Sequence, residues 1–159
     1  MISVCIPTFN GEKFIKQQLD SILNQSMPVD EIIISDDSSS DNTVKIIKSY
    51  NNNRIKLIEN QTFKSPIFNL ENALKKANGD YIFLADQDDI WYDNKVEIMM
   101  KHLKDYNLVV SNCEIIDEND AVLVHSFFKV MNSGKGVFKN LIKNTYSGNC
   151  MALNKNLLK

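Results

Sequence analysis

The stretch Tyr81-Ile82-Phe83-Leu84-Ala85-Asp86-Gln87-Asp88-Asp89-Ile90-Trp91 joins a run of apolar residues to a cluster of carboxylates. Its first five residues are mostly apolar, which predicts a buried strand. Asp86, Asp88 and Asp89 then fall within four positions, where that strand should end. Carboxylates this close repel one another, and a hard divalent cation would neutralise them and use their oxygens as ligands. The alternative is an acidic turn that caps the following helix.

Other apolar runs of strand length lie on both sides of this stretch, and helical patterns separate them. Strands are expected at residues 2–6, 31–35, 55–59, 81–85 and 108–110. Because strands and helices alternate, the sequence predicts an α/β fold with a mostly parallel, Rossmann-like sheet and helices on both faces.

The helix between the third and fourth strands has clear end signals. Ser65-Pro66 is expected to start it, with Ser as the N-cap and Pro in the first turn. Ile67, Leu70 and Leu74 supply its expected apolar face. Gly79 is expected to end it.

Three other helices are expected: one after residues 10–12, one capped by Asp41 or Asn42, and one through residues 96–103. The pattern loosens after Ser111. Weaker patterns there predict an edge strand at 121–125, a short helix at 137–142, a strand at 151–153 and a helix from Asn154.

Composition excludes several classes of protein. A chain of 159 residues with 43% hydrophobic and 24% charged residues is typical of one globular domain. The net charge of −2 gives no reason to expect nucleic acid as a partner. Cys5, Cys113 and Cys150 are far apart and predict reduced thiols, as in cytoplasmic proteins. No signal peptide or membrane-spanning apolar run is recognised.

Polar residues follow the first two strands as well. Pro7-Thr8-Phe9-Asn10-Gly11 lacks the glycines and the lysine of a P-loop or a dinucleotide-binding loop. Ser35-Asp36-Asp37-Ser38-Ser39-Ser40-Asp41 brings carboxylates that can accept hydrogen bonds from a nucleobase or a ribose, or cap a helix. Because parallel strands end at one edge of the sheet, the two acidic clusters should converge there, and the pattern predicts a nucleotide site.

Several motifs together resemble family 2 glycosyltransferases. The opening Val4-Cys5-Ile6-Pro7-Thr8-Phe9-Asn10-Gly11-Glu12-Lys13-Phe14-Ile15 is similar to theirs, as is Gln18-Leu19-Asp20-Ser21-Ile22-Leu23-Asn24-Gln25-Ser26. Asp36-Asp37-Ser38-Ser39-Ser40-Asp41-Asn42-Thr43 resembles a third family motif. Ala85-Asp86-Gln87-Asp88-Asp89-Ile90-Trp91 resembles the DxD motif in the form found in bacterial rhamnosyltransferase-like members.

The resemblance implies a single GT-A domain over residues 1–159, with an incomplete C-terminal part. Residues 1–111 would form the nucleotide-sugar-binding half, and residues 112–159 would begin the acceptor-binding half. The implied activity is inverting transfer of a sugar from a UDP- or dTDP-sugar to a glycan or lipid-linked acceptor in cell-surface polysaccharide synthesis. Peripheral association with the inner face of the plasma membrane and a homodimer that covers exposed apolar surface are further expectations.

The resemblance also implies roles for residues at the first two strand ends. Pro7 and Thr8 would lie against the nucleobase. Asp36 or Asp37 would accept a hydrogen bond from N3–H of the base, which favours a uridine or thymidine nucleotide.

At the fourth strand, Asp86 would approach the ribose and the metal, and Asp88 would be the direct Mg²⁺ or Mn²⁺ ligand that bridges to the diphosphate. Asn10, Gln87 and Trp91 would complete the nucleotide-sugar pocket. Core packing of Trp91 is the alternative.

Two departures from the family pattern stand out. Ser38 replaces the usual glycine, and a positive φ there would be strained. Inverting transfer needs a general base, which family members carry beyond a glycine-containing strand that Tyr146-Ser147-Gly148-Asn149-Cys150-Met151-Ala152-Leu153 resembles. The base is therefore expected beyond Lys159. Lys64 is a candidate contact to phosphate.

Two alternative functions stay open. A non-catalytic nucleotide-sugar-binding fragment or partner subunit would account for the missing base. A sugar nucleotidyltransferase would share the sheet and the metal, but it would be expected to carry a glycine-rich basic loop where residues 7–13 stand.

Overall fold

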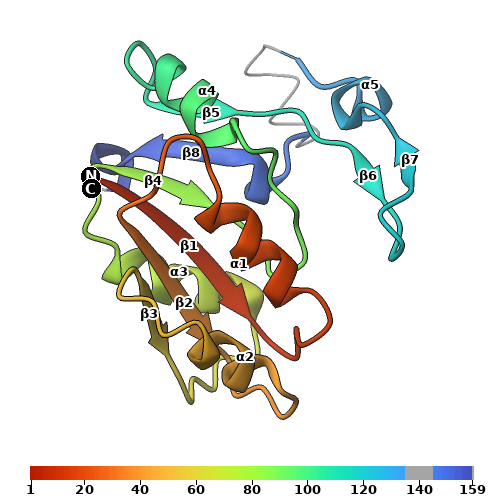
Figure 1. Ribbon diagram of the computed structural model, residues 1–159. Coiled ribbons are helices and arrows are strands. Elements are labelled where there is room, and N and C mark those ends of the chain that lie inside the picture. The colour runs from red at the N-terminus through yellow and green to blue at the C-terminus, as the bar shows by residue number, and fades with distance from the viewer. Residues whose placement is uncertain (135–144, 159) are drawn as a thin grey trace.

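A computed structural model of the protein describes residues 1–134 and 145–158. A six-stranded sheet with the strand order β3-β2-β1-β4-β8-β5 forms its centre (Figure 1). The strands are β1 (Ile2–Thr8), β2 (Glu31–Asp36), β3 (Ile55–Ile58), β4 (Tyr81–Leu84), β5 (Leu108–Val110) and β8 (Met151–Asn154). β1 pairs in parallel with β2 and β4, and β2 pairs in parallel with β3. Only β8 runs antiparallel to its neighbours, so the expected mostly parallel sheet is confirmed.

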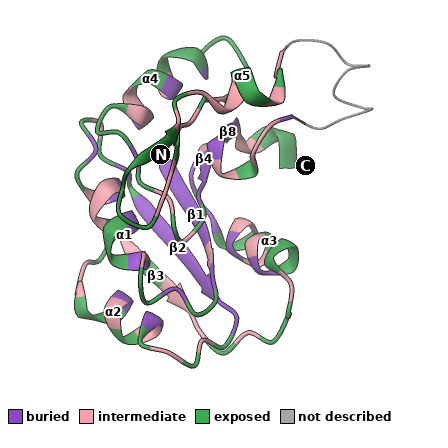
Figure 2. Cartoon of the chain, turned by 90° about the vertical axis from the view of Figure 1, so that its right-hand side faces the viewer, coloured by how far each residue is buried: buried purple, intermediate pink, exposed green. Residues whose placement is uncertain are grey.

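Helices cover both faces of this sheet, as predicted (Figure 2). Side chains that alternate along a strand point to opposite faces, and β1 sends Val4 and Ile6 into one core cluster and Cys5 into the other. The first cluster takes buried residues from α1 (Ile15–Leu23), α2 (Thr43–Ser49) and α4 (Lys95–His102). The second takes them from α3 (Pro66–Lys76).

The start of α3 is as predicted, and its end is not. Ser65 is the N-cap, and its hydroxyl accepts a hydrogen bond from the Phe68 amide at 3.5 Å. The helix ends at Lys76, and Ala77 is already extended, so Gly79 does not terminate it. Gly79 instead lies against β1, where an added Cβ would come within 2.5 Å of Ser3 Oγ. The close approach of two backbones, rather than a helix cap, accounts for this glycine.

The buried face of α3 also differs from the prediction. Ile67 is 75% exposed, whereas Asn69 and Ala73 are buried, and Leu70 and Leu74 are half-buried. The helix therefore turns a polar residue, Asn69, toward the sheet.

Asn42 is the N-cap residue of α2, but the side-chain hydrogen bond at this end comes from Asp41. The Asp41 carboxylate accepts a hydrogen bond from the Thr43 amide at 3.0 Å, and the Asn42 side chain makes no cap bond.

Residues 115–131, between β5 and β8, form a smaller unit that stands apart from the main sheet (Figure 1). β6 (Ile115–Ile116) pairs with β7 (Val122–Val124) in a two-stranded sheet, and α5 (Phe127–Met131) follows. The edge strand expected at 121–125 is therefore a strand, but it pairs with β6 rather than with the main sheet. The helix expected at 137–142 lies outside the described residues.

Before β8, a short 3₁₀ turn, η1 (Gly148–Cys150), leads into the strand. A second one, η2 (Lys155–Leu158), stands where a helix was expected from Asn154. All three cysteines are free, and Cys5 and Cys150 are buried. Within the described part of the chain, no helix is long and apolar enough to cross a membrane.

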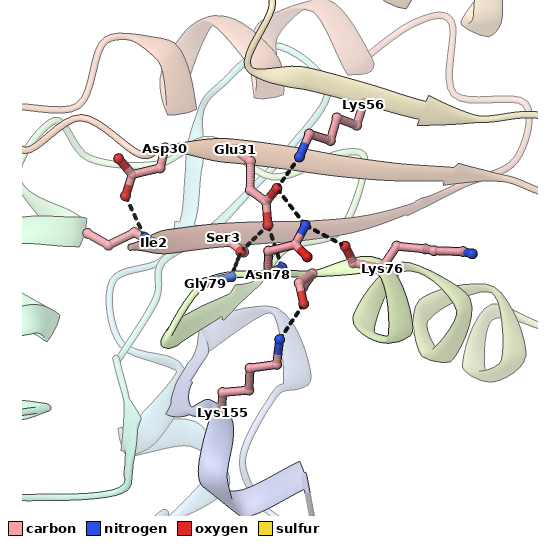
Figure 3. A network of polar contacts seen from close by, with 10 residues as sticks. Ile2, Ser3, Asp30, Glu31, Lys56, Lys76, Asn78, Gly79 and Lys155 are labelled. Carbon is pink, nitrogen blue, oxygen red and sulfur yellow. Dashed lines mark hydrogen bonds and ion pairs between the residues drawn. The ribbon is translucent and has the colours of Figure 1, made fainter.

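A buried carboxylate ties the amino ends of the strands together (Figure 3). Glu31 accepts hydrogen bonds from Ser3 Oγ at 2.6 Å, Lys56 Nζ at 2.5 Å and the Asn78 amide at 2.6 Å. Ser3 Oγ in turn accepts the Gly79 amide at 2.8 Å. Burial would raise the pKa of Glu31, but these hydrogen bonds outweigh it and lower the pKa from 4.5 to about 2. This network lies at the edge of the sheet opposite the two acidic clusters.

Candidate functional site

The ends of β1, β2 and β4 meet at the carboxyl edge of the sheet, as the sequence predicted. Thr8 and Asp36 are directly paired in the β1–β2 register. A cavity of about 610 Å³ opens there. Of the residues expected at a nucleotide site, the cavity wall includes Pro7, Thr8, Asp37, Asp86, Gln87 and Asp88. Lys64, which has a φ of 50°, and Asn69 also line it.

Asp36 and Asn10 do not line this cavity. The buried Asp36 carboxylate accepts hydrogen bonds from Thr8 Oγ1 at 3.0 Å, from the Ser39 amide at 2.9 Å and from Ser39 Oγ at 2.5 Å. Asn10 Oδ1 accepts the Ser40 amide at 2.9 Å. Both side chains therefore hold the turn after β2 in place.

The turn after β2 contains a residue with a positive φ, Ser38, at the position where the sequence analysis expected such a φ to be strained. Ser38 has a φ of 61°, a conformation that costs an L-residue roughly 1–2 kcal/mol. Its hydroxyl donates to Gln61 O at 2.6 Å, which offsets part of that cost.

Asp37 faces the cavity and also holds the loop before α3. Its carboxylate accepts hydrogen bonds from the Phe63 amide at 2.6 Å and the Ser65 amide at 3.3 Å. Because these bonds shape the cavity wall, Asp37 acts on the pocket both as a lining residue and through the loop.

Asn69 is a site residue that sequence reasoning missed. It is 2% exposed, and its Nδ2 donates to Thr8 O at 3.1 Å. That bond fixes the amide orientation, because a backbone carbonyl can only accept. Asn69 Oδ1 is then left buried, and no described residue donates to it. An unpaired buried acceptor is costly, and Asn69 carries it at the wall of the cavity.

Gln87 attaches the acidic loop to the end of β1. Its Oε1 accepts the Phe9 amide at 2.9 Å, and its Nε2 donates to Phe9 O at 3.2 Å. Gly11 lies beneath this amide, where an added Cβ would come within 2.5 Å of Gln87 Oε1. Both polar atoms of the Gln87 side chain are therefore hydrogen-bonded to the protein backbone.

Asp86 and Asp88 are different. Neither carboxylate has a hydrogen bond or salt bridge with any described residue, and both line the cavity. Partial desolvation, and then the charge of Asp88, raise the pKa of Asp86. Two like charges held close without a partner favour a cation between them.

Asp89, the third carboxylate, is engaged within the protein. Its Oδ2 accepts the Asp86 amide at 3.2 Å, and its Oδ1 accepts Asn149 Nδ2 at 2.7 Å. Burial is the main reason that its pKa is raised to about 6. The three carboxylates that look alike in the sequence therefore have two separate roles.

A second cavity, of about 850 Å³, lies on the other side of the acidic loop. Asp86 and Asp88 line both cavities. Trp91 lines only the second. It is 3% exposed, belongs to the core and packs against Phe83 with ring centroids 6.0 Å apart. Lys95 Nζ lies 4.3 Å from the centroid of the Trp91 ring.

The residues at the edge fit a divalent cation that is shared with a phosphorylated ligand. Within residues 1–134 and 145–158 there is no group of three or more His, Cys, Asp or Glu side chains placed for a metal. Asp86 and Asp88 supply two carboxylates that line the same cavities. Mg²⁺ and similar cations are commonly held by one or two carboxylates, with water and substrate phosphates completing the shell.

Comparison with known proteins places this architecture. Residues 3–159 match the family model described as Glycosyl transferase family 2. The chain is 35% identical over 124 residues to the UDP-Glc:alpha-D-GlcNAc-diphosphoundecaprenol beta-1,3-glucosyltransferase WfgD of Escherichia coli, covering 77% of this chain and 49% of that protein. The chain thus spans about half the length of this curated relative.

Two solved structures share the fold. TarS 1-349 of S. aureus in complex with UDP-GlcNAc aligns with a TM-score of 0.70 at 20% identity, over 99% of this chain and 46% of that one. The mannosyltransferase PcManGT from Pyrobaculum calidifontis, in complex with GDP-Man and Mn²⁺, aligns with a TM-score of 0.71 at 21% identity, over 99% and 45%.

Proposed function

This chain belongs to glycosyl transferase family 2, and from that premise we propose that it binds a UDP- or dTDP-sugar and transfers the sugar, with inversion, to a glycan acceptor. One observation carries the proposal: the free carboxylates of Asp86 and Asp88 stand between two cavities at the carboxyl edge of the sheet. A donor on one side and an acceptor on the other would meet at this point.

The smaller cavity is the proposed nucleotide pocket. Pro7 and Thr8 would lie against the base. The Asp37 carboxylate in the cavity wall is an acceptor, and uracil and thymine present N3–H as a donor. The Escherichia coli relative is named for UDP-Glc, and the TarS structure holds UDP-GlcNAc, which supports a uridine nucleotide.

Asp86 and Asp88 are the proposed residues for a Mg²⁺ or Mn²⁺ ion and the diphosphate. When bound, the cation would neutralise the charge that develops on the diphosphate leaving group. Gln87 holds the loop that carries both carboxylates, and Lys64, which lines the same cavity, would meet phosphate. The Mn²⁺ in the PcManGT complex supports this assignment.

The larger cavity is the proposed acceptor side. Residues 112–127 and 147–150 contribute much of its wall, so residues 1–111 would serve the donor and residues 112–159 would begin the acceptor part. The Escherichia coli relative is named for a sugar-diphosphoundecaprenol acceptor. A lipid-linked glycan in cell-surface polysaccharide synthesis is the acceptor class we propose.

Calorimetric titration of UDP, dTDP and GDP into the purified chain, with and without Mn²⁺, tests the donor assignment. We expect UDP or dTDP to bind more tightly than GDP, and Mn²⁺ to strengthen that binding. A folded protein that binds none of the three would contradict the proposal.

The base side of the pocket has its own test in Asn69→Leu, which removes the hydrogen bond from Asn69 to Thr8 O at similar side-chain volume. We expect UDP affinity to fall about tenfold or more, since one lost hydrogen bond to a buried partner costs about 1–3 kcal/mol. Asn72→Leu on the same helix is the matched control, because Asn72 Nδ2 donates to Ser35 Oγ at 2.9 Å and does not line the cavity. Equal losses in the two variants would remove Asn69 from the base pocket.

A further inference from the structure

The acidic loop that follows β4 is held from two sides. On the β1 side, the Gln87 amide makes its two hydrogen bonds to the Phe9 backbone. On the β8 side, Asp89 accepts a hydrogen bond from Asn149. The loop's remaining side chains, Asp86 and Asp88, point into the cavities without a described partner. Anchored and free side chains therefore alternate along the loop.

Asn149 is at the centre of the β8-side contacts. Its Nδ2 donates to Asp89 Oδ1 at 2.7 Å, and its Oδ1 accepts a hydrogen bond from Ser147 Oγ. Its backbone carbonyl accepts Lys95 Nζ at 3.2 Å. A carboxylate can only accept and the Ser147 hydroxyl is free to donate, so these partners together fix the orientation of the amide. The side chain has one arrangement that satisfies both.

Asp89 connects Asn149 to the backbone of the loop through a second hydrogen bond. Its second oxygen accepts the Asp86 amide at 3.2 Å, so the chain from Asn149 through Asp89 ends on the backbone of one of the free carboxylates. Without this anchor, the repulsion between Asp86 and Asp88 would favour a loop in which they move apart. Holding them together before a cation arrives removes that reorganisation from the cost of binding.

We propose that Asn149 is a positioning residue for the metal–diphosphate site: through Asp89 it holds the acidic loop so that Asp86 and Asp88 share one cation. The inference rests on the proposed function, because it concerns the same site. It assigns Asp89 to the support of the site rather than to the cation itself. It also gives the 3₁₀ turn before β8 a part in donor binding, although this turn is 60 residues away from Asp89 in the sequence.

The test compares UDP binding with and without Mn²⁺ in four variants. Asn149→Ala removes the hydrogen bond. Asn149→Asp places a carboxylate against Asp89. The double variant Asp89→Asn with Asn149→Asp exchanges the two groups, so that an amide at position 89 can donate to a carboxylate at position 149 and still accept the Asp86 amide. Asn119→Ala, in the exposed turn between β6 and β7, is the control.

We expect Asn149→Ala to reduce the Mn²⁺-dependent gain in UDP affinity about tenfold, the usual scale for a group that supports a metal ligand. Binding without metal should be unchanged. Asn149→Asp should lose more, and the exchanged double variant should recover to within about threefold of the wild type. The Asn119→Ala variant should match the wild type.

Three results would overturn the inference while leaving the proposed function in place: an unchanged Mn²⁺ effect in Asn149→Ala, an equal loss with and without metal, or no recovery in a folded double variant. Absence of any UDP binding by the wild-type chain would instead remove the proposed function, and the inference with it.

Discussion

At the scale of single residues, the four positions from Asp86 to Asp89 divide into two kinds. Asp86 and Asp88 keep their carboxylates clear of the rest of the described chain, whereas Gln87 and Asp89 use their polar atoms to hold the loop. The stretch from Asp86 to Asp89, which lies in the turn after β4, therefore alternates two ligand candidates with two anchors.

The Gln87 anchor gives a direct prediction through its neighbour Gly11. Gly11→Ala would place a Cβ 2.5 Å from Gln87 Oε1 and 2.7 Å from Gln87 Cδ, so the amide must leave Phe9. We expect UDP affinity to fall about three- to tenfold, in line with about 0.5–1.5 kcal/mol for a hydrogen bond, as measured by calorimetry. Gln87→Ala should show the same loss. Affinity that is unchanged in both variants would mean that the anchor does not shape the pocket.

Only some of the residues at this site could be predicted from the sequence. The carboxylates at the ends of β2 and β4 could be found because acidic residues at two strand ends of a parallel sheet must converge. Asn69 could not be predicted as a site residue, because the apolar residues of its helix predicted that Ile67 faces the sheet. No spacing rule identifies a polar residue that turns toward the sheet instead. Nor could sequence separate Asp36, which is saturated by Thr8 and Ser39, from Asp37, which lines the cavity.

At the scale of elements, prediction succeeded where burial leaves a continuous pattern. β1, β2 and β4 are short apolar runs that are buried on both faces, and α1 and α4 have clear helical spacing. β8 was predicted as a strand, but its place between β4 and β5 depends on long-range pairing that no local pattern records. β6 and α5 have no fully buried residue to mark them, and they were missed.

Gly79 gives a test at this scale, because its role changed from helix cap to close backbone approach. Gly79→Ala would bring Cβ to 2.7 Å from Ser3 N and 2.9 Å from Met1 O, so backbone must move. We expect a loss of about 1–3 kcal/mol in the free energy of unfolding, measured by urea denaturation. Gly148→Ala is the matched control, since nothing lies within 4 Å of its Cβ position. Equal stability of the two variants would contradict the close approach.

At the scale of the whole molecule, the sheet separates stability from function. The buried Glu31 network joins β1, β2, β3 and the chain entering β4 at their amino ends (Figure 3), while the two cavities open at the carboxyl edge. Substitutions in the network should therefore change the free energy of unfolding and leave nucleotide affinity unaltered in the folded protein.

The lowered pKa of Glu31 predicts how stability depends on pH. Because the folded pKa of about 2 is below the unfolded value of 4.5, the network stabilises the fold fully above about pH 5, and this stabilisation is lost as the pH falls toward 2. Glu31→Gln should cost about 2 kcal/mol at pH 7, allowing for the solvent exposure of Lys56. When urea denaturation is measured between pH 7 and 3, the free energy of unfolding should depend less steeply on pH in Glu31→Gln than in the wild type.

The control for this prediction is Glu71→Gln, which breaks the exposed pair of Glu71 with Lys75 on α3. The free energy of unfolding of that variant should depend on pH as it does in the wild type, because exposed ion pairs within a helix contribute little to stability. The same pH dependence of the free energy of unfolding in Glu31→Gln and the wild type would show that Glu31 does not stabilise the fold through its charge.

The central claim is that the free carboxylates at the end of β4 hold a cation together with a nucleotide diphosphate. Calorimetric titration of UDP into the wild type and Asp88→Asn, each with and without Mn²⁺, tests it most directly. We predict that Mn²⁺ strengthens UDP binding to the wild type, and that Asp88→Asn loses this gain while its metal-free binding and its thermal stability are kept. An equal Mn²⁺ effect in the two proteins would contradict the claim.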